Sequence, residues 1–476
     1  MFPSPIYINR SEGKVRKLVL SGLVQVLLVL AGCGGGSGTV ATSTSNNGSS
    51  GNNGQSSNSV TITVDSGPDP SVGYDVDTPF VTVTVCAPGS TTNCQQIDHV
   101  EVDTGSFGLR VMSSVLNASL ASALRQETSS DGNSVVECTM FADGFSWGPV
   151  KIANVQMAGE SASSVPIQVM GDPAYEQTSG SGSTAISEIP TACSGTGPEE
   201  DTVVTFGANA ILGMGAFADD CGSDCGLAPS DASNPAYYYE CPATSWSPGN
   251  PCSEAAVAEP AQVTDPVTGF QTDNNGVIVE LPSATEGAGS LTGTLIFGIG
   301  TEGNNTYAAK TLLTANPGSG TFSTEYTTQG GTQQFLPYSI LDTGSNAYYF
   351  ADDSIPSVGA CSSYPGYDSS NPDTWFCPGS ELELSATNTG QNGTQSTVAF
   401  SIGNAYTLFQ RYSGSVFDDL GASSGSQDTN CADQSSAAAH NDCSFDFGFP
   451  FFLGKDVYIA FAGANTSQGT GPYFAY

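Results

Sequence analysis

The stretch VDTGS at residues 102–106 recurs as LDTGS at residues 341–345, and the two aspartates are 239 residues apart. An apolar pair and a glycine follow each copy, as ILG at residues 211–213 and as FLG at residues 452–454. These glycines lie 110 and 112 residues after their aspartates. A single Asp-Thr-Gly is weak evidence, because aspartate and glycine are common in turns. Two copies with nearly equal internal spacing indicate a duplicated lobe.

The sequence around these motifs predicts strands joined by turns. Several segments alternate between apolar and polar residues or form short β-branched runs, as half-buried and buried strands do. These segments are residues 81–85, 97–102, 276–281, 293–298 and 457–461. Helical signal is sparse and is strongest at residues 113–126. We therefore predict a mainly β protein with two related lobes, residues 59–275 and 276–476, and a Cys-, Pro- and Tyr-rich insertion at residues 218–260.

Residues 1–33 have the pattern of a bacterial signal peptide. Four basic residues precede an apolar run over residues 18–30, and the segment ends in Leu-Ala-Gly-Cys at Cys33. The run is too short to span a bilayer, whose apolar core of about 30 Å needs roughly 20 apolar residues. Leu-Ala-Gly-Cys resembles the lipobox of bacterial lipoproteins, which implies that Cys33 becomes the lipidated first residue of the mature chain. The alternative is a plain secretory signal.

Residues 34–58 consist almost entirely of Gly, Ser, Thr and Asn, a composition typical of a flexible linker. A lipid at Cys33 and this linker together predict a protein tethered to the bacterial cell envelope. Gly34 is not the aspartate associated with retention at the inner membrane. The sequence therefore favours the outer membrane, with the protein facing the periplasm or the cell surface.

The chain is strongly acidic. Its formal net charge is −36, and the residues after Cys33 carry six basic and 45 acidic side chains. Such a charge repels phosphate groups, which argues against nucleic acid and anionic membrane surfaces as partners. It suits an acidic environment, where protonated carboxyl groups no longer repel one another. We expect a monomer whose contact with the membrane is the lipid anchor.

Cysteine usage indicates export to an oxidising compartment. Setting Cys33 aside leaves 12 of the 13 cysteines, an even number consistent with six disulfides. Proximity in the sequence suggests five pairs and leaves two cysteines for the sixth. The predicted pairs are Cys86–Cys94, Cys138–Cys193, Cys221–Cys225, Cys241–Cys252, Cys361–Cys377 and Cys431–Cys443. A metal site is the rival interpretation, but the chain has only two histidines and no paired C-x-x-C units. We therefore expect neither a metal nor another cofactor.

The two motifs and their surroundings resemble the pepsin-like aspartic proteases from about residue 60 to the end of the chain. The resemblance implies a two-lobed acid-protease fold with pseudo-twofold symmetry and a cleft between the lobes that binds a peptide or protein substrate. It implies that Asp103 and Asp342 are catalytic carboxylates that share one proton and activate a water molecule. In that family the loop threonines bond across the lobe interface, and the glycines and serines bond the carboxylates. These supporting residues are Thr104, Gly105, Ser106, Thr343, Gly344 and Ser345.

The segment FADGFSWG at residues 141–148 resembles the flap hairpin of the family, which implies that Phe141 and Gly144 lie over the substrate. The chain departs from the family at Phe141, where a tyrosine is usual, and at Arg110, where a tryptophan usually receives the bond of that tyrosine. The sequence therefore leaves two functions open. The first is a membrane-anchored aspartic endopeptidase. The second is a non-proteolytic cell-envelope protein that binds peptide or glycan on the same scaffold.

Overall fold

The computed structural model describes residues 58–69, 75–181, 185–242, 246–365, 367, 374–425, 431 and 443–476. The predicted signal peptide with Cys33 lies outside the described residues, as do residues 34–57 of the predicted linker, and both stay predictions. In the part of the chain that is described, no helix is long and apolar enough to cross a membrane.

The first lobe is built on a sheet that closes on itself. Its main strands are β2 (Pro79–Cys86), β3 (Cys94–Asp103), β4 (Phe107–Met112), β7 (Phe145–Met157), β8 (Glu160–Met170) and β11 (Ala210–Met214). They lie in the order β7, β8, β4, β11, β3, β2, and β7 also pairs with β2. At the outer side of β7 the sheet continues through β6 (Ser134–Met140), β12 (Tyr238–Cys241) and β13 (Ser253–Glu254).

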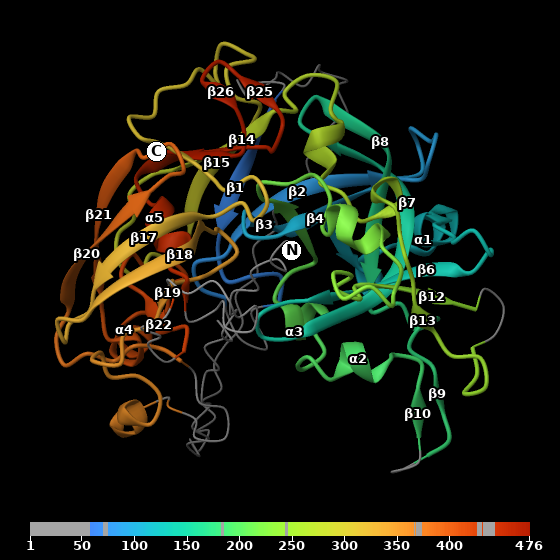
Figure 1. Cartoon of the computed structure of the whole chain (residues 1–476), viewed down its shortest axis with the longest axis horizontal. Coiled ribbons are helices and arrows are strands. Elements are labelled where there is room, and N and C mark those ends of the chain that lie inside the picture. The colour runs from blue at the N-terminus through green and yellow to red at the C-terminus, as the bar shows by residue number, and fades with distance from the viewer. Residues whose placement is uncertain are drawn as a thin grey trace, which may run out of the picture.

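The same sheet joins the two lobes. β1 (Ser59–Val64) pairs antiparallel with β2 on one side and with β15 (Leu291–Phe297) on the other. The sheet then runs through β14 (Gly276–Leu281), β24 (Lys455–Ala460), β27 (Tyr473–Ala475) and β16 (Leu312–Thr314). Figure 1 shows β1, β14 and β15 between the two lobes. β1 thus ties the two lobes together.

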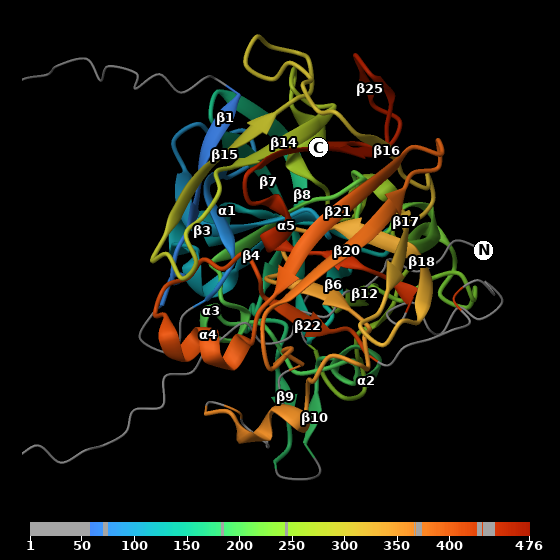
Figure 2. The same cartoon turned by 90° about the vertical axis from the view of Figure 1, so that its left-hand side faces the viewer.

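The second lobe has its own sheet. Its strands are β17 (Phe322–Thr327), β18 (Gln333–Leu341), β19 (Tyr348–Phe350), β20 (Leu382–Thr389), β21 (Gln395–Ile402), β22 (Gly421–Ser423) and β23 (Asp446–Phe447). They lie in the order β21, β20, β17, β18, β23, β19, β22. The β20–β21 hairpin lies on the side of this lobe that faces the viewer in Figure 2.

Helices, two short hairpins and one short strand complete the fold. The helices are α1 (Ala118–Ala123), α2 (Thr191–Ser194), α3 (Val203–Phe206), α4 (Ala405–Arg411) and α5 (Phe449–Phe452). The short strands are β5 (Arg125–Gln126), β9 (Thr178–Ser179), β10 (Ile186–Ser187), β25 (Asn465–Thr466) and β26 (Gly469–Thr470). The helix predicted at residues 113–126 is only partly present. α1 is capped by the side chain of Asn117 and ends at Ala123, because β5 pairs with β7 instead.

Each lobe places its Asp-Thr-Gly-Ser loop in the same strand arrangement. β11 lies between β3, to which it is parallel, and β4, to which it is antiparallel, with Gly213 opposite Asp103. β23 lies in the same way between β18 and β19. The interpretation of residues 452–454 as the repeat of residues 211–213 is therefore wrong. The counterpart is residues 446–448, and FLG instead joins α5 to β24.

The predicted strands coincide with β2, β3, β14, β15 and β24. Their inward side chains belong to the main hydrophobic core, which explains the alternation seen in the sequence. Fully buried examples are Val83, Val100, Val279, Leu295 and Val457. The prediction of a mainly β protein with two related lobes is confirmed.

All six predicted disulfides are present, with Cα–Cα distances from 4.0 to 5.9 Å. Five of them close loops of 4 to 16 residues. The sixth, Cys138–Cys193, has a sequence separation of 55 and links β6 to α2. Proximity in the sequence was sufficient for the short loops, and the sixth pair followed by elimination.

Candidate active site

The two Asp-Thr-Gly-Ser loops face each other where the lobes meet. Asp103 is the last residue of β3, Asp342 directly follows β18, and the two residues are only 4% and 7% exposed. A Cβ atom added at Gly105 would lie 2.3 Å from Oδ2 of Asp342, and one added at Gly344 would lie 2.5 Å from Oδ1 of Asp103. Each carboxyl group therefore packs against the glycine of the other loop, where a larger residue has no room.

The two threonines hold the loops together. The Thr104 hydroxyl donates to the carbonyl oxygen of Leu341 at 2.9 Å, and the Thr343 hydroxyl donates to that of Val102 at 2.6 Å. The Thr104 N–H also donates to the Thr343 hydroxyl at 3.1 Å, and the Thr343 N–H donates to the Thr104 hydroxyl at 3.0 Å. Because both threonines are buried, water does not compete for these bonds, and the spacing of the loops is fixed.

Each carboxyl group accepts hydrogen bonds from its own loop. The Gly105 N–H donates to Oδ1 of Asp103 at 2.7 Å, and the Ser106 hydroxyl donates to Oδ2 at 2.5 Å. In the second loop the equivalent glycine N–H and serine hydroxyl donate to Oδ1 and Oδ2 of Asp342 at 2.7 and 3.1 Å. Such bonds favour the ionised form of a carboxyl group. The structure thus brings together all eight loop residues that the sequence singles out.

Burial and repulsion favour a single proton on the pair. Burial raises the pKa of Asp342 well above its ordinary value, the charges of Asp103 and Asp446 and a hydrogen bond to Asp103 raise it further, and the Gly344 N–H opposes this shift. Two carboxylates in contact cannot both ionise easily. The pair therefore keeps a proton at a pH where ordinary aspartates are ionised. One member can accept a proton while the other donates one.

A third carboxyl group, which the sequence analysis missed, lies beside the pair. Asp446 is fully buried and in register with Ile340, two residues before Asp342. Because paired neighbours point to the same face of a sheet and residues alternate along a strand, Asp446 lies on the face that carries Asp342. Burial raises its pKa well above the ordinary value, while the Ser345 hydroxyl opposes this shift. The corresponding residue of the first lobe is Ile211, so the repeat alone gave no signal for an acid here.

The predicted flap is the β6–β7 hairpin, whose turn holds Phe141 and Gly144. The Phe141 N–H donates to the carbonyl oxygen of Gly144 at 2.8 Å, and its ring packs edge-to-face on Phe206 with the centroids 5.4 Å apart. The Phe145 N–H donates to the carbonyl oxygen of Pro198 at 2.9 Å, and the Glu200 N–H donates to the carbonyl oxygen of Phe145 at 2.8 Å. The turn is therefore held by the first lobe, and Phe141 and Gly144 do not line the pocket next to the aspartates.

Arg110 lies in a buried polar cluster that supports the flap. Its guanidinium donates to Glu137 at 2.6 Å, to Asp220 at 3.1 Å, to the Thr139 hydroxyl at 2.9 Å and to the carbonyl oxygen of Phe107 at 2.6 Å. Glu137 and Thr139 belong to the flap strand β6, and Phe107 directly follows the first Asp-Thr-Gly-Ser loop. Arg110 thus connects the flap to this loop, so its departure from the family pattern does not leave the flap unsupported.

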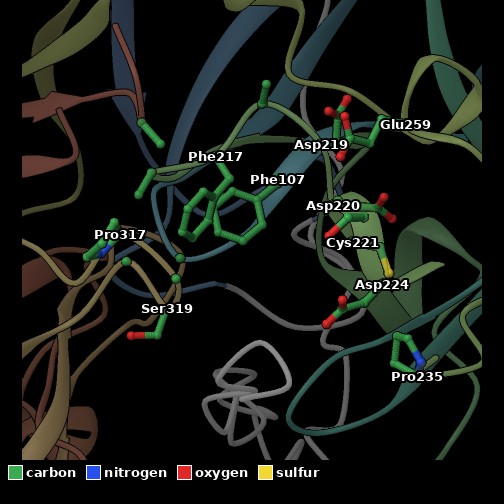
Figure 3. Close-up of a pocket in the computed structure, with 18 of the residues that line it drawn as sticks. Phe107, Phe217, Asp219, Asp220, Cys221, Asp224, Pro235, Glu259, Pro317 and Ser319 are labelled. Carbon is green, nitrogen blue, oxygen red and sulfur yellow. The ribbon is translucent and has the colours of Figure 1, made fainter. Parts of the chain in front are cut away.

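A pocket of about 510 Å³ adjoins the loops at the boundary between the lobes. Thr104 and Gly105 line it from the first loop, and Ile340 lines it from the strand before the second. The rings of Phe107 and Phe217 lie together with their centroids 5.4 Å apart, and carboxyl groups lie across the pocket from them (Figure 3). These carboxyl groups belong to Asp219, Asp220, Asp224 and Glu259. The pocket therefore offers an apolar surface beside the carboxyl pair.

Comparisons with known proteins find a similar solved structure and a matching family model. No curated protein matches its sequence. Among solved structures, the aspartic proteinase from Irpex lacteus is similar to it, with a TM-score of 0.43 and 15% sequence identity, over 88% of this chain and 96% of that chain. A family model described as "Protein of unknown function (DUF3443)" matches residues 54–476. The chain therefore belongs to the DUF3443 family.

Proposed function

We propose that the chain is an aspartic endopeptidase that hydrolyses peptide bonds with a water molecule held between Asp103 and Asp342. The ionised carboxylate accepts a proton from the water as its oxygen attacks the peptide carbonyl carbon. The protonated carboxyl group donates its proton to the carbonyl oxygen. The resulting diol then collapses: one of its hydroxyl groups gives a proton to the ionised member of the pair, the other member protonates the amine nitrogen, and the C–N bond breaks. The pair returns to its starting state with one proton, and no covalent intermediate forms.

One observation carries this proposal: two buried carboxyl groups from different lobes share a hydrogen bond, and burial and repulsion favour one proton on the pair. General acid and general base are then present in the same site. The threonine bonds between the loops support the mechanism further, because a preorganised pair needs no rearrangement during the reaction.

The pocket supports a peptide or protein as the substrate. An extended peptide that crosses the boundary between the lobes can place one apolar side chain against Phe107 and Phe217. Its next peptide bond then lies near Gly105, which packs against Asp342. We expect cleavage next to apolar residues, by a monomer that Cys33 anchors by its lipid to the bacterial cell envelope.

A second candidate function is a cell-envelope protein that binds peptide or glycan without hydrolysing it. The flap favours this alternative, because Phe141 has no hydroxyl to offer near the reacting water. Residues 198–200 also hold the turn through two backbone bonds that a closing flap would have to break. The two intact Asp-Thr-Gly-Ser loops favour the endopeptidase.

The test is to incubate the purified protein, with its disulfides intact, with an unstructured protein at pH values from 3 to 7. We expect cleavage that a statine-type transition-state mimic blocks, with fragment ends that report the preferred side chains. A demonstrably folded protein that cleaves nothing across this range would refute the proposal and favour the binding protein.

A further inference from the structure

The carboxyl group of Asp446 is fixed next to the carboxyl pair by the strand that carries it. Asp446 begins β23, and backbone hydrogen bonds join the residues on both sides of it to the strand that ends at the second Asp-Thr-Gly-Ser loop. The Ile340 N–H donates to the carbonyl oxygen of Phe445 at 3.2 Å, and the Asp342 N–H donates to that of Phe447 at 3.1 Å. Asp446 lies between these two bonded residues, so its position relative to Asp342 is fixed.

The Ser345 hydroxyl connects this third carboxyl group to the pair. It donates to Oδ2 of Asp342 at 3.1 Å, and it lies close enough to Asp446 to oppose the rise in the pKa of that residue. The Phe449 N–H, three residues after Asp446, donates to the carbonyl oxygen of Ser345 at 2.6 Å and holds this serine in place. Because a hydroxyl has one proton to donate and Ser345 gives it to Asp342, Asp446 remains without a donor of its own.

Asp446 has the surroundings of a neutral carboxyl group. It is 0% exposed, and neither of its oxygens has a hydrogen-bond partner of normal geometry. The ion pairs of the described residues involve only His99 and Arg110, so none of them compensates a charge on Asp446. An ionised carboxylate in such a place is very unfavourable. Asp446 therefore keeps its proton at a pH where exposed aspartates are ionised, in agreement with the effect of burial on its pKa.

A charge on Asp446 acts on the carboxyl pair. The titratable groups that face Asp446 are Asp342, Asp103 and, across the sheet on β19, Tyr349. The Tyr349 hydroxyl donates to Asn346 at 2.6 Å, and α5, which follows β23, carries no titratable residue. After burial and the charge of Asp103, the charge of Asp446 is the next cause that raises the pKa of Asp342.

We propose that Asp446 is a positioning residue that keeps the shared proton on Asp103 and Asp342 as the pH rises. This role deepens the proposed peptide hydrolysis and rests on it. At acidic pH Asp446 is neutral, and the pair loses one proton to give the active form. At higher pH Asp446 ionises, and its negative charge then opposes the loss of the remaining proton from the pair. The pair should therefore stay active to a higher pH than two carboxyl groups alone would.

The pH profile of kcat/KM for Asp446→Asn tests this role, because the amide has the size of the carboxyl group and cannot ionise. We expect the acidic midpoint of the profile to stay in place and the alkaline midpoint to fall by at least about one pH unit, a tenfold weaker hold on the last proton. A purely structural role would lower kcat/KM at every pH and leave both midpoints in place. Asp265→Asn removes another fully buried carboxyl group, outside both loops, and should keep both midpoints.

Infrared titration measures the same proton without hydrolysis. The C=O stretch of a protonated carboxyl group is lost when the group ionises, and the difference between the spectra of the wild type and Asp342→Asn isolates the signal of the pair. When both proteins also carry Asp446→Asn, this signal should be lost at least about one pH unit lower. Asp446→Ile, which introduces the residue type of Ile211 in the first lobe, should give the same shift and covers the case in which a buried amide prevents folding.

The two readouts separate this role from the peptide hydrolysis on which it rests. An infrared midpoint that the Asp446 variants leave unchanged would refute the role of Asp446, even in an active protease. A lowered midpoint in a protein that hydrolyses nothing would support the role of Asp446 in holding the proton and refute the endopeptidase.

Discussion

Replacing Asp342 by asparagine is expected to lower kcat/KM for peptide hydrolysis by about 10⁴-fold or more. The amide cannot hold the proton that the two carboxyl groups share, and it cannot exchange a proton with the reacting water. The Gly344 N–H can still donate to the amide oxygen, and the amide N–H can donate to the Ser345 hydroxyl in place of the bond that this hydroxyl gives to Asp342, so the loop should keep its shape. Initial rates on a fluorogenic peptide at pH 4 to 5 give the ratio. Asp103→Asn should have an effect of similar size.

Asp265→Asn is the matched control for this substitution. Asp265 is fully buried, and its side chain accepts the Val267 N–H at 2.9 Å, a bond that asparagine can keep. It lies outside the two loops, so kcat/KM should stay within about twofold of the wild type. The melting temperature of Asp342→Asn should not fall, because the change removes a carboxyl group whose ionisation burial disfavours. An Asp342→Asn variant that retains more than a tenth of the wild-type activity would rule out the proposed mechanism.

The free energy of unfolding is expected to fall as the pH rises from 5 to 8. Burial raises the pKa of several carboxyl groups above their ordinary values. Examples are Asp77, Asp220, Asp265, Asp342 and Asp446. Between the ordinary and the raised pKa, the native state binds more protons than the unfolded state, so stability decreases with pH. The stabilisation is complete below about pH 4 and is lost as the pH approaches the raised value, about 8 for Asp265.

The effect should be large. Each unit of pKa difference corresponds to about 1.4 kcal/mol, so Asp265 alone accounts for a loss on the order of 5 kcal/mol between pH 4 and 8. That is comparable to the whole stability of many proteins, about 5–15 kcal/mol. Urea denaturation at pH 5 and pH 8 measures it, and Asp265→Asn should flatten the dependence while the exposed Glu383→Gln should not. A urea midpoint that is higher at pH 8 than at pH 5 would contradict the expectation.

The sequence predicted best those features in which the residue types of a short segment are required by its own conformation and contacts. The Asp-Thr-Gly-Ser loops could be found because Gly105 and Gly344 are required by the close approach of the opposite carboxyl group, and Thr104 and Thr343 by the bonds between the loops. Strands such as β2 and β14 could be found because one face of each is buried. Most of the disulfides could be paired because their loops are short.

Features that depend on distant residues could not be found in this way. Arg110 donates hydrogen bonds to Glu137 and Asp220, which are 27 and 110 residues away in the sequence. The residues next to Arg110 in the sequence do not predict these contacts. Asp77 accepts a hydrogen bond from the Phe417 N–H only because the lobes fold against each other. The sequence pattern matches residues 211–213 with FLG at residues 452–454. The true counterpart, residues 446–448, begins with the acidic Asp446 where the first lobe has the apolar Ile211, so it does not fit the pattern of an apolar pair and a glycine. That same interruption places a third carboxyl group beside the pair.

Calorimetric binding of two peptides at pH 4.5 tests the carboxyl pair most directly. One peptide carries a statine-type hydroxyl in place of the scissile bond, and the other is identical but lacks the hydroxyl. Because a catalytic site binds the transition state more tightly than the ground state, the hydroxyl peptide should bind at least 100-fold more tightly, and Asp342→Asn should abolish the difference. Equal affinities for the two peptides in the wild type would show a cleft that binds peptide without a catalytic pair.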